Sequence, residues 1–190
     1  MVNNGKPKVG VLALQGDFEA HCRAIERAGA HGVEVRTAEE LNSVDALVIP
    51  GGESTTMLKL LGIENLFEPL REFGAKKPIF GTCAGAILLA KEVLNPAQAS
   101  LGLMDLTVER NAYGRQIDSR IATINVAGHT TEAVFIRAPI IRKVGPAVKV
   151  LAEYLGTPVL AEQGKHMVAT FHPELTHHNS TVHRHFIEKI

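Results

Sequence analysis

The chain has 190 residues, 45% of them hydrophobic, and its 20 basic and 20 acidic residues cancel. This length and apolar content predict one domain over residues 1–190, with a substantial core. Neither charge sign forms a block, which argues against nucleic-acid binding and against a charged membrane surface. The apolar runs are too short to cross a membrane, and a signal-peptide pattern is missing. The lack of a charged patch leads us to expect a small ligand. With only two cysteines there is no disulfide framework, so we expect a cytoplasmic protein.

The first half of the chain alternates apolar runs with helical patterns. Strands are predicted at 9–14, 33–35, 45–49 and 77–80. Helices are predicted at 18–28, 55–61, 66–73 and 86–91. In the first helix, Phe18, Cys22, Ile25 and Ala28 recur at helical spacing until Gly29. Continuous apolar runs are typical of parallel strands that are buried on both faces, so we expect a doubly wound α/β sheet with a flavodoxin-like core, flanked by helices.

Beyond Asn95 the pattern changes to short strand-like runs. They fall at 106–108, 121–126, 134–136, 148–151, 159–160 and 167–171, and a closing helix is predicted at 181–190. We expect these runs to extend the sheet with antiparallel or mixed strands. No repeat or linker indicates a second domain.

Cys83 lies at a predicted strand-to-helix corner, within the pattern Gly81-Thr82-Cys83-Ala84-Gly85. Small residues around a nucleophile let the backbone turn sharply and leave the side chain accessible, as in the nucleophile elbow of hydrolases. The start of the following helix also favours a thiolate over a thiol. The alternative is an ordinary apolar cysteine, which is what we predict for Cys22. We predict that Cys83 is a nucleophile.

His172 and Glu174 flank Pro173, far downstream of Cys83. Proline excludes a helix interior, and in an extended or turning segment side chains two residues apart can work together. Glu174 would then fix the tautomer of His172, which exchanges protons with Cys83 and the leaving group. In isolation the pair would indicate only a hydrogen-bonded histidine near a surface glutamate. Following an elbow cysteine, it predicts a Cys-His-Glu triad.

The segment Pro50-Gly51-Gly52-Glu53-Ser54 follows the third predicted strand, at the edge of the sheet where α/β proteins bind ligands. The plain alternative is a turn in which Ser54 caps a helix. Beside an elbow, such glycines can direct a backbone N–H toward a developing oxyanion. The N–H of Ala84 is the natural second donor. We therefore predict that Gly52 and Ala84 form an oxyanion hole.

The C-terminal region carries four histidines. Because they lack the ligand grouping and carboxylate partners of a zinc site, we predict no metal. We expect them to lie on a loop and on an exposed helix face: His177, His178, His183 and His185.

Several blocks of the sequence, in order, resemble the glutaminase subunits of pyridoxal 5′-phosphate synthase, a family of class I (triad) glutamine amidotransferases. The likeness covers nearly the whole chain. The elbow and the His-x-Glu pair are shared by the class, whereas the blocks at 53–56, 110–116 and 135–139 are typical of this family. One departure is the pair Ala112-Tyr113, where Ser-Phe is common.

The resemblance implies a class I glutamine amidotransferase fold with Cys83, His172 and Glu174 as the triad. It also implies contacts with substrate glutamine from Gly52, Glu53, Ser54, Arg110, Ile136 and Arg137. A guanidinium suits the substrate α-carboxylate because it makes bidentate, charge-assisted hydrogen bonds. Arg110 and Arg137 are both candidates for that role.

The reaction that the resemblance implies is hydrolysis of L-glutamine through a γ-glutamyl thioester on Cys83, without a cofactor. Ammonia would become protonated in bulk water, so it must pass directly to a partner. The resemblance names this partner as a (β/α)₈-barrel subunit in a hetero-oligomer that makes pyridoxal 5′-phosphate. Three alternatives remain open: the glutaminase of another triad amidotransferase, a catalytically silent regulatory binding module, and a cysteine hydrolase acting on peptides or γ-glutamyl chains.

Overall fold

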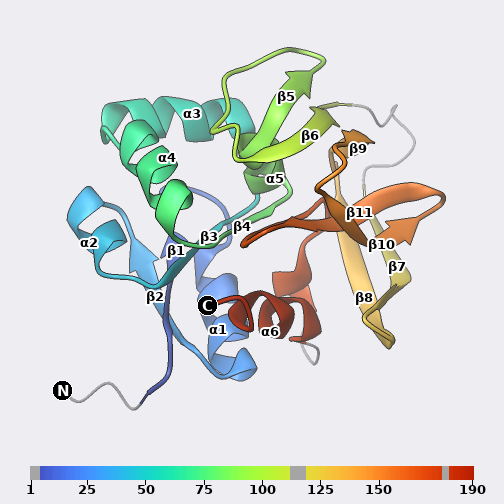
Figure 1. Cartoon of the computed structure of the whole chain (residues 1–190), viewed down its shortest axis with the longest axis horizontal. Helices are drawn as coiled ribbons and strands as arrows, with labels where there is room; N and C mark the ends of the chain where they lie inside the picture. The colour runs from blue at the N-terminus through green and yellow to red at the C-terminus, as the bar shows by residue number, and fades with distance from the viewer. Residues whose placement is uncertain (1–4, 112–118, 177–179) are drawn as a thin grey trace.

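The structure is a computed structural model, and it describes residues 5–111, 119–176 and 180–190 (Figure 1). Its main sheet has seven strands in the order β10-β11-β12-β4-β3-β1-β2. Five neighbouring strands are parallel, and β11 and β10 extend one edge in antiparallel fashion. The bounds are β1 Lys8–Leu12, β2 His31–Val35, β3 Ala46–Ile49, β4 Ile79–Thr82, β10 Lys149–Tyr154, β11 Thr157–Gln163 and β12 His166–Ala169.

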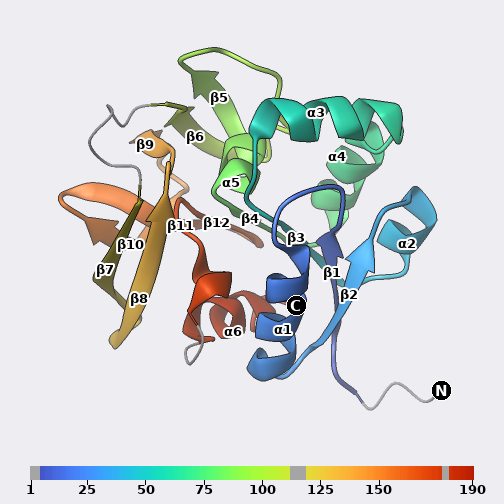
Figure 2. The ribbon, with the colours of Figure 1, turned by 180° about the vertical axis from the view of Figure 1, so that it is seen from behind.

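Helices cover both faces of this sheet. On one face lie α1 (Phe18–Ala28) and α6 (Thr181–Ile187), side by side in both views (Figures 1 and 2). The opposite face is covered by α2 (Ala38–Asn42), α3 (Ser54–Ile63), α4 (Phe67–Lys76) and α5 (Ala84–Leu89). The doubly wound α/β prediction is therefore confirmed.

The main sheet has one hydrophobic core on each of its faces, and alternating side chains of each central strand point into one core or the other. In β3, Val48 packs with the helices α1 and α6, whereas Leu47 and Ile49 pack on the other face. Because both faces are covered, every residue of β3 and β4 is buried, which explains the continuous apolar runs.

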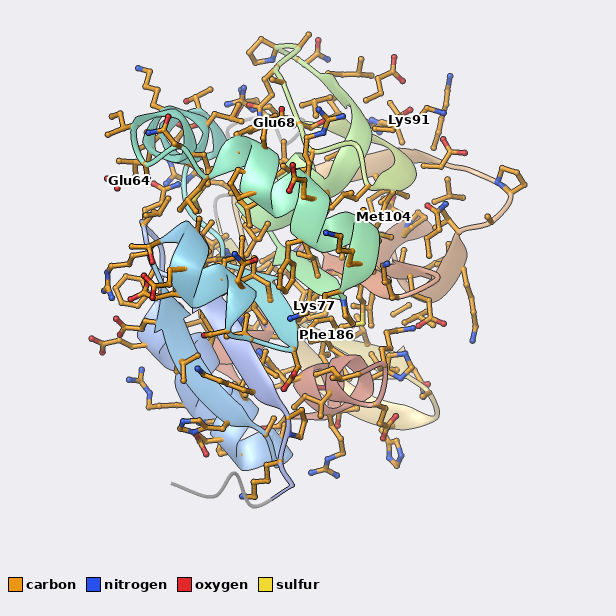
Figure 3. All side chains as sticks on the ribbon, turned by 60° about the vertical axis from the view of Figure 1, so that its left-hand side comes forward. Glu64, Glu68, Lys77, Lys91, Met104 and Phe186 are labelled. Carbon is orange, nitrogen blue, oxygen red and sulfur yellow. The ribbon has the colours of Figure 1, made fainter. Side chains whose placement is uncertain are left out.

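Charged residues such as Glu64, Glu68 and Lys91 lie on the outside of the molecule. Phe186 of α6 is buried, with its ring 5.4 Å from that of Phe80 (Figure 3).

Two smaller sheets form the rest of the molecule. One contains β5 (Ala90–Leu94), β6 (Met104–Glu109) and β9 (Ile140–Val144), in that order, with β5 and β6 parallel and β9 antiparallel to β6. The other is a hairpin of β7 (Ser119–Val126) and β8 (His129–Ile136). A short 3₁₀ turn, η1 (Pro173–Leu175), leads toward α6. Of the helices among the described residues, none has the length and apolarity that crossing a bilayer requires.

Three expectations from the sequence need correction. The helix after Cys83 spans Ala84–Leu89 rather than 86–91, because Ala90 begins β5, which pairs with β6. The runs at 106–108, 121–126 and 134–136 do not extend the main sheet, because β6 pairs with β5 and β9, and β7 pairs with β8, to form the two smaller sheets.

The third correction concerns the C-terminal histidines. His183 is not exposed: it is 1% accessible on the inner face of α6, where its ring packs against those of His21 and Phe80. His185 is partly buried, and its Nε2 lies 3.0 Å from Glu162 Oε2. His177 and His178 lie outside the described residues.

Candidate active site

The carboxyl ends of β1, β3, β4 and β12 meet at one edge of the main sheet, as parallel strands require. Each end leads into a segment that the sequence analysis singled out. Gln15, in the loop after β1, donates from Nε2 to the carbonyl oxygen of Glu53 at 2.6 Å and so ties that loop to the one after β3. Cys83 follows β4, and His172 follows β12.

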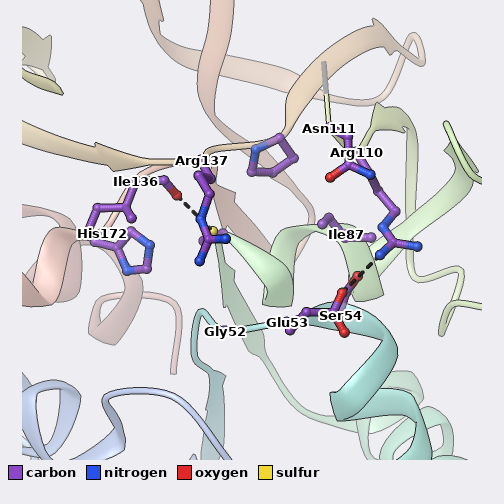
Figure 4. Close-up of a pocket in the computed structure, with 11 residues that line it drawn as sticks. Gly52, Glu53, Ser54, Ile87, Arg110, Asn111, Ile136, Arg137 and His172 are labelled. Carbon is purple, nitrogen blue, oxygen red and sulfur yellow. Dashed lines mark hydrogen bonds and ion pairs between the residues drawn. The ribbon is translucent and has the colours of Figure 1, made fainter. Parts of the chain in front are cut away.

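A cavity of about 220 Å³ opens at this edge (Figure 4). This is a volume for a small molecule rather than for a folded chain. His172 lies on one side of it, and Glu53 and Arg110 lie on the other. The complete lining is Gly52, Glu53, Ser54, Cys83, Ile87, Arg110, Asn111, Ile136, Arg137, Pro139 and His172.

Cys83 occupies a strained elbow. Its φ of 49° and ψ of −104° are unusual for a residue with a side chain, and such strain gathers at functional sites. The conformation is held because the Cys83 N–H still donates to the Ala169 carbonyl at 2.8 Å, while α5 begins at the next residue. A Cβ at Gly81 would overlap the carbonyl of Gly85, and one at Gly85 would overlap that of Ile49. Both positions therefore require glycine.

His172 and Glu174 form a directed pair. His172 Nδ1 lies 2.7 Å from Glu174 Oε1, and because an ionised carboxylate only accepts hydrogen bonds, Nδ1 carries the proton. This leaves Nε2 for the thiol or the substrate. The His172 side chain is 13% exposed and that of Glu174 only 1%, so the carboxylate lies behind the imidazole and away from the cavity.

The charges of the site follow from this pairing. Burial alone would lower the pKa of His172, but hydrogen bonding with Cys83 and Glu174 and the charges of these groups raise it to about 10. Burial would raise the pKa of Glu174, but the hydrogen bond and the charge of His172 hold it well below its usual range. At neutral pH the pair is therefore an imidazolium and a carboxylate beside the Cys83 sulfur.

Glu53 and Arg110 form the opposite wall. Arg110 Nη2 lies 3.0 Å from Glu53 Oε1, and Arg110 is 7% exposed although it belongs to a loop after β6. Its Nη1 is buried and has no hydrogen-bond partner in the described part of the chain. Partial burial would raise the pKa of Glu53, but hydrogen bonds from Thr55 and Thr56 lower it to about 2. The wall thus offers one carboxylate and one guanidinium with a free donor.

Glu53 is also the N-cap of α3, since its carboxylate accepts from the Thr56 N–H at 2.8 Å. The plain interpretation, in which Ser54 caps this helix, is wrong: Ser54 is the first helical residue, and its hydroxyl donates to Gln98 Oε1 at 2.9 Å. Helix capping therefore fixes the Glu53 carboxylate at the rim of the cavity.

The hairpin supplies the third wall. Ile136 ends β8, and its carbonyl oxygen lies 4.0 Å from the Cys83 sulfur. Arg137 follows with φ 43° and is exposed, with its side chain in the cavity. The main sheet and both smaller sheets therefore meet around one sulfur.

The glycines after β3 allow a close approach. A Cβ at Gly51 would overlap the imidazole carbon Cε1 of His172 and lie 3.3 Å from the Cβ of Cys83. Gly52 has φ 135°, a conformation that side chains disfavour. The N–H of Ala84 is the first of α5, so it has no intrahelical acceptor.

The structure thus brings all the predicted site residues to one place, with Glu174 and Ala84 buried behind the lining. The sequence analysis did not assign Ile87, Asn111 or Pro139 to the site. Ile87 lies one helical turn after Cys83, a spacing that could have indicated it. Asn111 and Pro139 lie inside the family blocks at 110–116 and 135–139, next to or two residues after a predicted contact residue. Residues 112–116 of the block at 110–116, including Ala112 and Tyr113, lie outside the described residues.

Comparison with known proteins agrees with this geometry. The model of the SNO glutamine amidotransferase family matches residues 11–190. The chain belongs to this family. It is 60% identical to pyridoxal 5′-phosphate synthase subunit PdxT of Solibacter usitatus, covering 96% of this chain and 99% of that protein. The corresponding subunit of Koribacter versatilis is 57% identical, covering 96% and 95%.

A solved structure described as a glutamine amidotransferase superimposes with a TM-score of 0.89 at 46% identity, covering 95% of this chain and 97% of that one. The resemblance inferred from the sequence blocks, and the fold that it implied, are confirmed.

Proposed function

We propose that this chain hydrolyses L-glutamine to glutamate and ammonia at Cys83, with His172 and Glu174 as the acid–base pair. The observation that carries the proposal is the strained Cys83 elbow beside an imidazolium whose pKa is raised to about 10. A thiol held this way is a ready nucleophile for a carboxamide carbon. The pocket is lined from all three sheets, so we take residues 1–190 as one glutaminase domain.

The other walls suit the α-carbon end of glutamine. Its carboxylate can bind the guanidinium of Arg110 or that of Arg137, both of which line the cavity, and its ammonium can bind the Glu53 carboxylate. Ser54 and Ile136 complete these contacts. A peptide would bury these charges without partners, which disfavours the peptide hydrolase alternative.

The reaction then takes two steps. The Cys83 thiolate attacks the carboxamide carbon, the N–H groups of Gly52 and Ala84 stabilise the oxyanion, and His172 donates a proton as ammonia leaves. This produces a γ-glutamyl thioester. Water attacks the thioester and gives its proton to His172, which releases glutamate and restores the thiolate.

The ammonia is used in the synthesis of pyridoxal 5′-phosphate. Relatives that match over nearly their whole length are subunits of that synthase. We propose that the receiving partner is a (β/α)₈-barrel subunit and that the two form a hetero-oligomer, because ammonia released into water would be protonated before it could react. A cytoplasmic location suits a free catalytic thiol.

The test compares two cysteine variants in the presence of the synthase subunit. Cys83→Ala is expected to reduce glutamate release from glutamine by at least ~10³-fold. Cys22→Ala should retain activity, because burial raises the pKa of the Cys22 thiol to about 11 and leaves it unreactive. Mass spectrometry of trapped turnover mixtures should find the glutamyl adduct on Cys83. Turnover by Cys83→Ala, or an adduct elsewhere, would overturn the proposal, and an inactive wild-type chain would favour the silent binding module.

A further inference from the structure

A chain of buried polar side chains continues behind Glu174. His21 of α1 is 0% exposed, and its Nε2 lies 3.3 Å from Glu174 Oε2. The same nitrogen lies 3.1 Å from the Thr82 hydroxyl, in the residue before the nucleophile. On the other side of the ring, Nδ1 lies 3.0 Å from Nε2 of His183, in α6. Glu174 is thus held between two histidines: His172 at Oε1 and His21 at Oε2.

The buried groups limit where the protons can be. Because Glu174 is ionised, a lone pair on His21 Nε2 would repel the carboxylate, so this nitrogen carries the proton. This nitrogen lies 3.1 Å from the Thr82 hydroxyl and 3.3 Å from Glu174 Oε2, and the contact with the carboxylate is too poorly aligned to be a regular hydrogen bond. Oε2 is buried and makes no regular hydrogen bond among the residues that the structure describes. The polar contact with His21 is therefore weak, and its removal would leave this oxygen more poorly stabilised.

The state of the second histidine follows from the first. If His21 is neutral with its proton on Nε2, its Nδ1 accepts from the Nε2–H of His183. His183 Nδ1 then keeps a lone pair and no proton, and it has no partner in the described part of the chain. A cationic His21 would instead force a proton onto His183 Nδ1, leaving a buried, unpaired N–H, a rare and costly arrangement. Burial also lowers the pKa of both imidazoles, that of His183 to about 3.

We infer that His21 is a positioning residue of the triad: its neutral Nε2–H holds the second oxygen of Glu174, and its orientation is fixed in turn by His183. This inference rests on the proposed function, because it concerns the same triad. His21 does not line the cavity, so it acts on the reaction only by keeping Glu174 ionised and aimed at His172 Nδ1. Such supporting groups around a reactive centre typically contribute 10- to 100-fold.

Other charged groups near this network are few. Asp17, the N-cap of α1, favours protonation of His21, and His172 opposes it. Arg27 opposes protonation of His183, and Glu174 favours it. The Cys83 sulfur acts on His172. None of these donates to Glu174 Oε2 in place of His21.

Activity measurements on the full chain with the synthase subunit can test the role. His21→Leu is expected to lower kcat for glutamine hydrolysis by ~10- to 100-fold with little change in KM, since the residue does not touch the pocket. The acid limb of the pH profile should move to higher pH, because a carboxylate that has lost its donor protonates more readily. His21→Gln, whose amide N–H can replace Nε2–H, should recover most of the lost kcat and the acid limb.

A matched control is available in His166. It is also buried, its Nδ1 accepts from the Ile79 N–H at 3.2 Å, and it lies away from the cavity. His166→Leu should lower stability without moving the pH profile. If His21→Leu and His166→Leu give the same kinetic result, or if Gln at position 21 fails to restore activity, His21 is only a packing residue.

A spectroscopic measurement makes the test independent of activity. With ring-¹⁵N histidine in the full chain, His21 should appear at pH 7 as the neutral Nε2–H tautomer, assigned by the signal that His21→Leu removes. An imidazolium or an Nδ1–H tautomer would overturn the inference. The outcomes also separate the two proposals: if Cys83→Ala hydrolyses glutamine normally, the proposed function fails, whereas an inactive Cys83→Ala beside a fully active His21→Leu removes only the role of His21.

Discussion

The main sheet and the two smaller sheets contribute differently to the pocket. The main sheet places Cys83, His172 and Glu174 in nearly dry surroundings, where backbone geometry and buried hydrogen bonds fix every position. The smaller sheets supply Arg110 and Arg137, charged side chains that follow strand ends and line the cavity. Under the proposed function, bond breaking would belong to the rigid core and recognition to the added strands.

The largest loss of activity should come from a substitution in the triad on the main sheet. Glu174→Gln is expected to lower kcat by ~10²- to 10⁴-fold, as when the carboxylate of a catalytic triad is replaced by an amide. It also removes the negative charge, and with it the charge-assisted hydrogen bond, that raise the pKa of His172. Because the imidazolium then loses its proton at lower pH, the alkaline limb of kcat/KM should move down from about 10 toward the usual histidine range.

The control for that variant is Glu64→Gln, which alters an exposed glutamate outside the pocket. It should leave the pH profile unchanged. An alkaline limb that stays in place in Glu174→Gln would mean that the carboxylate does not support His172.

The second-largest effect should be on the KM for glutamine. Arg110→Gln removes a guanidinium that pairs with Glu53 and has a free Nη1. A hydrogen bond to a charged group contributes about 1.5–3 kcal/mol, so KM for glutamine should rise ~10- to 100-fold while kcat changes little. Steady-state kinetics with the synthase subunit measures both constants.

Arg142→Gln is the matched control, because Arg142 lies on β9 of the same small sheet and pairs with Glu109 outside the pocket. Its KM should stay close to that of the wild type. A variant at Arg110 that lost kcat and kept KM would contradict the division between core and added strands.

The smallest effect concerns two glycines. Gly85→Ala would force a Cβ into the carbonyl of Ile49, and we expect it to destabilise the fold by about 1–3 kcal/mol. Gly62→Ala, in α3, meets no atom within 4 Å and should stabilise the fold by about 0.4–1 kcal/mol. Urea unfolding of both variants measures the difference, and equal stabilities would show that the elbow tolerates a side chain after all.

The parts of the site that could be predicted from the sequence are those encoded locally. The glycines around Cys83 and the close spacing of His172 and Glu174 are short patterns whose geometry follows from the chain itself. The order of strands in a parallel sheet then brings their carboxyl ends together. These rules were sufficient for the core of the fold and for the triad prediction.

The rest depends on tertiary pairing. Ala90 and Lys91 form a strand rather than a helix end because β6 lies beside them. His21 shows no spacing relation to Glu174, and the helical pattern through Cys22 pointed to a neighbouring face of α1. A histidine inside an amphipathic helix was the available signal, but its partner lies in a distant segment of the chain.

One consequence of the buried network concerns the timing of biosynthesis. His21 leaves the ribosome long before Cys83, and Cys83 long before the segment with His172, Glu174 and His183. A nascent chain that has emerged only as far as β11 therefore contains the thiol without its acid–base partner, and its first helix still lacks α6 as a neighbour. If the triad acts as proposed, a nascent chain gains the ability to hydrolyse glutamine only when these early and late segments close around the same carboxylate.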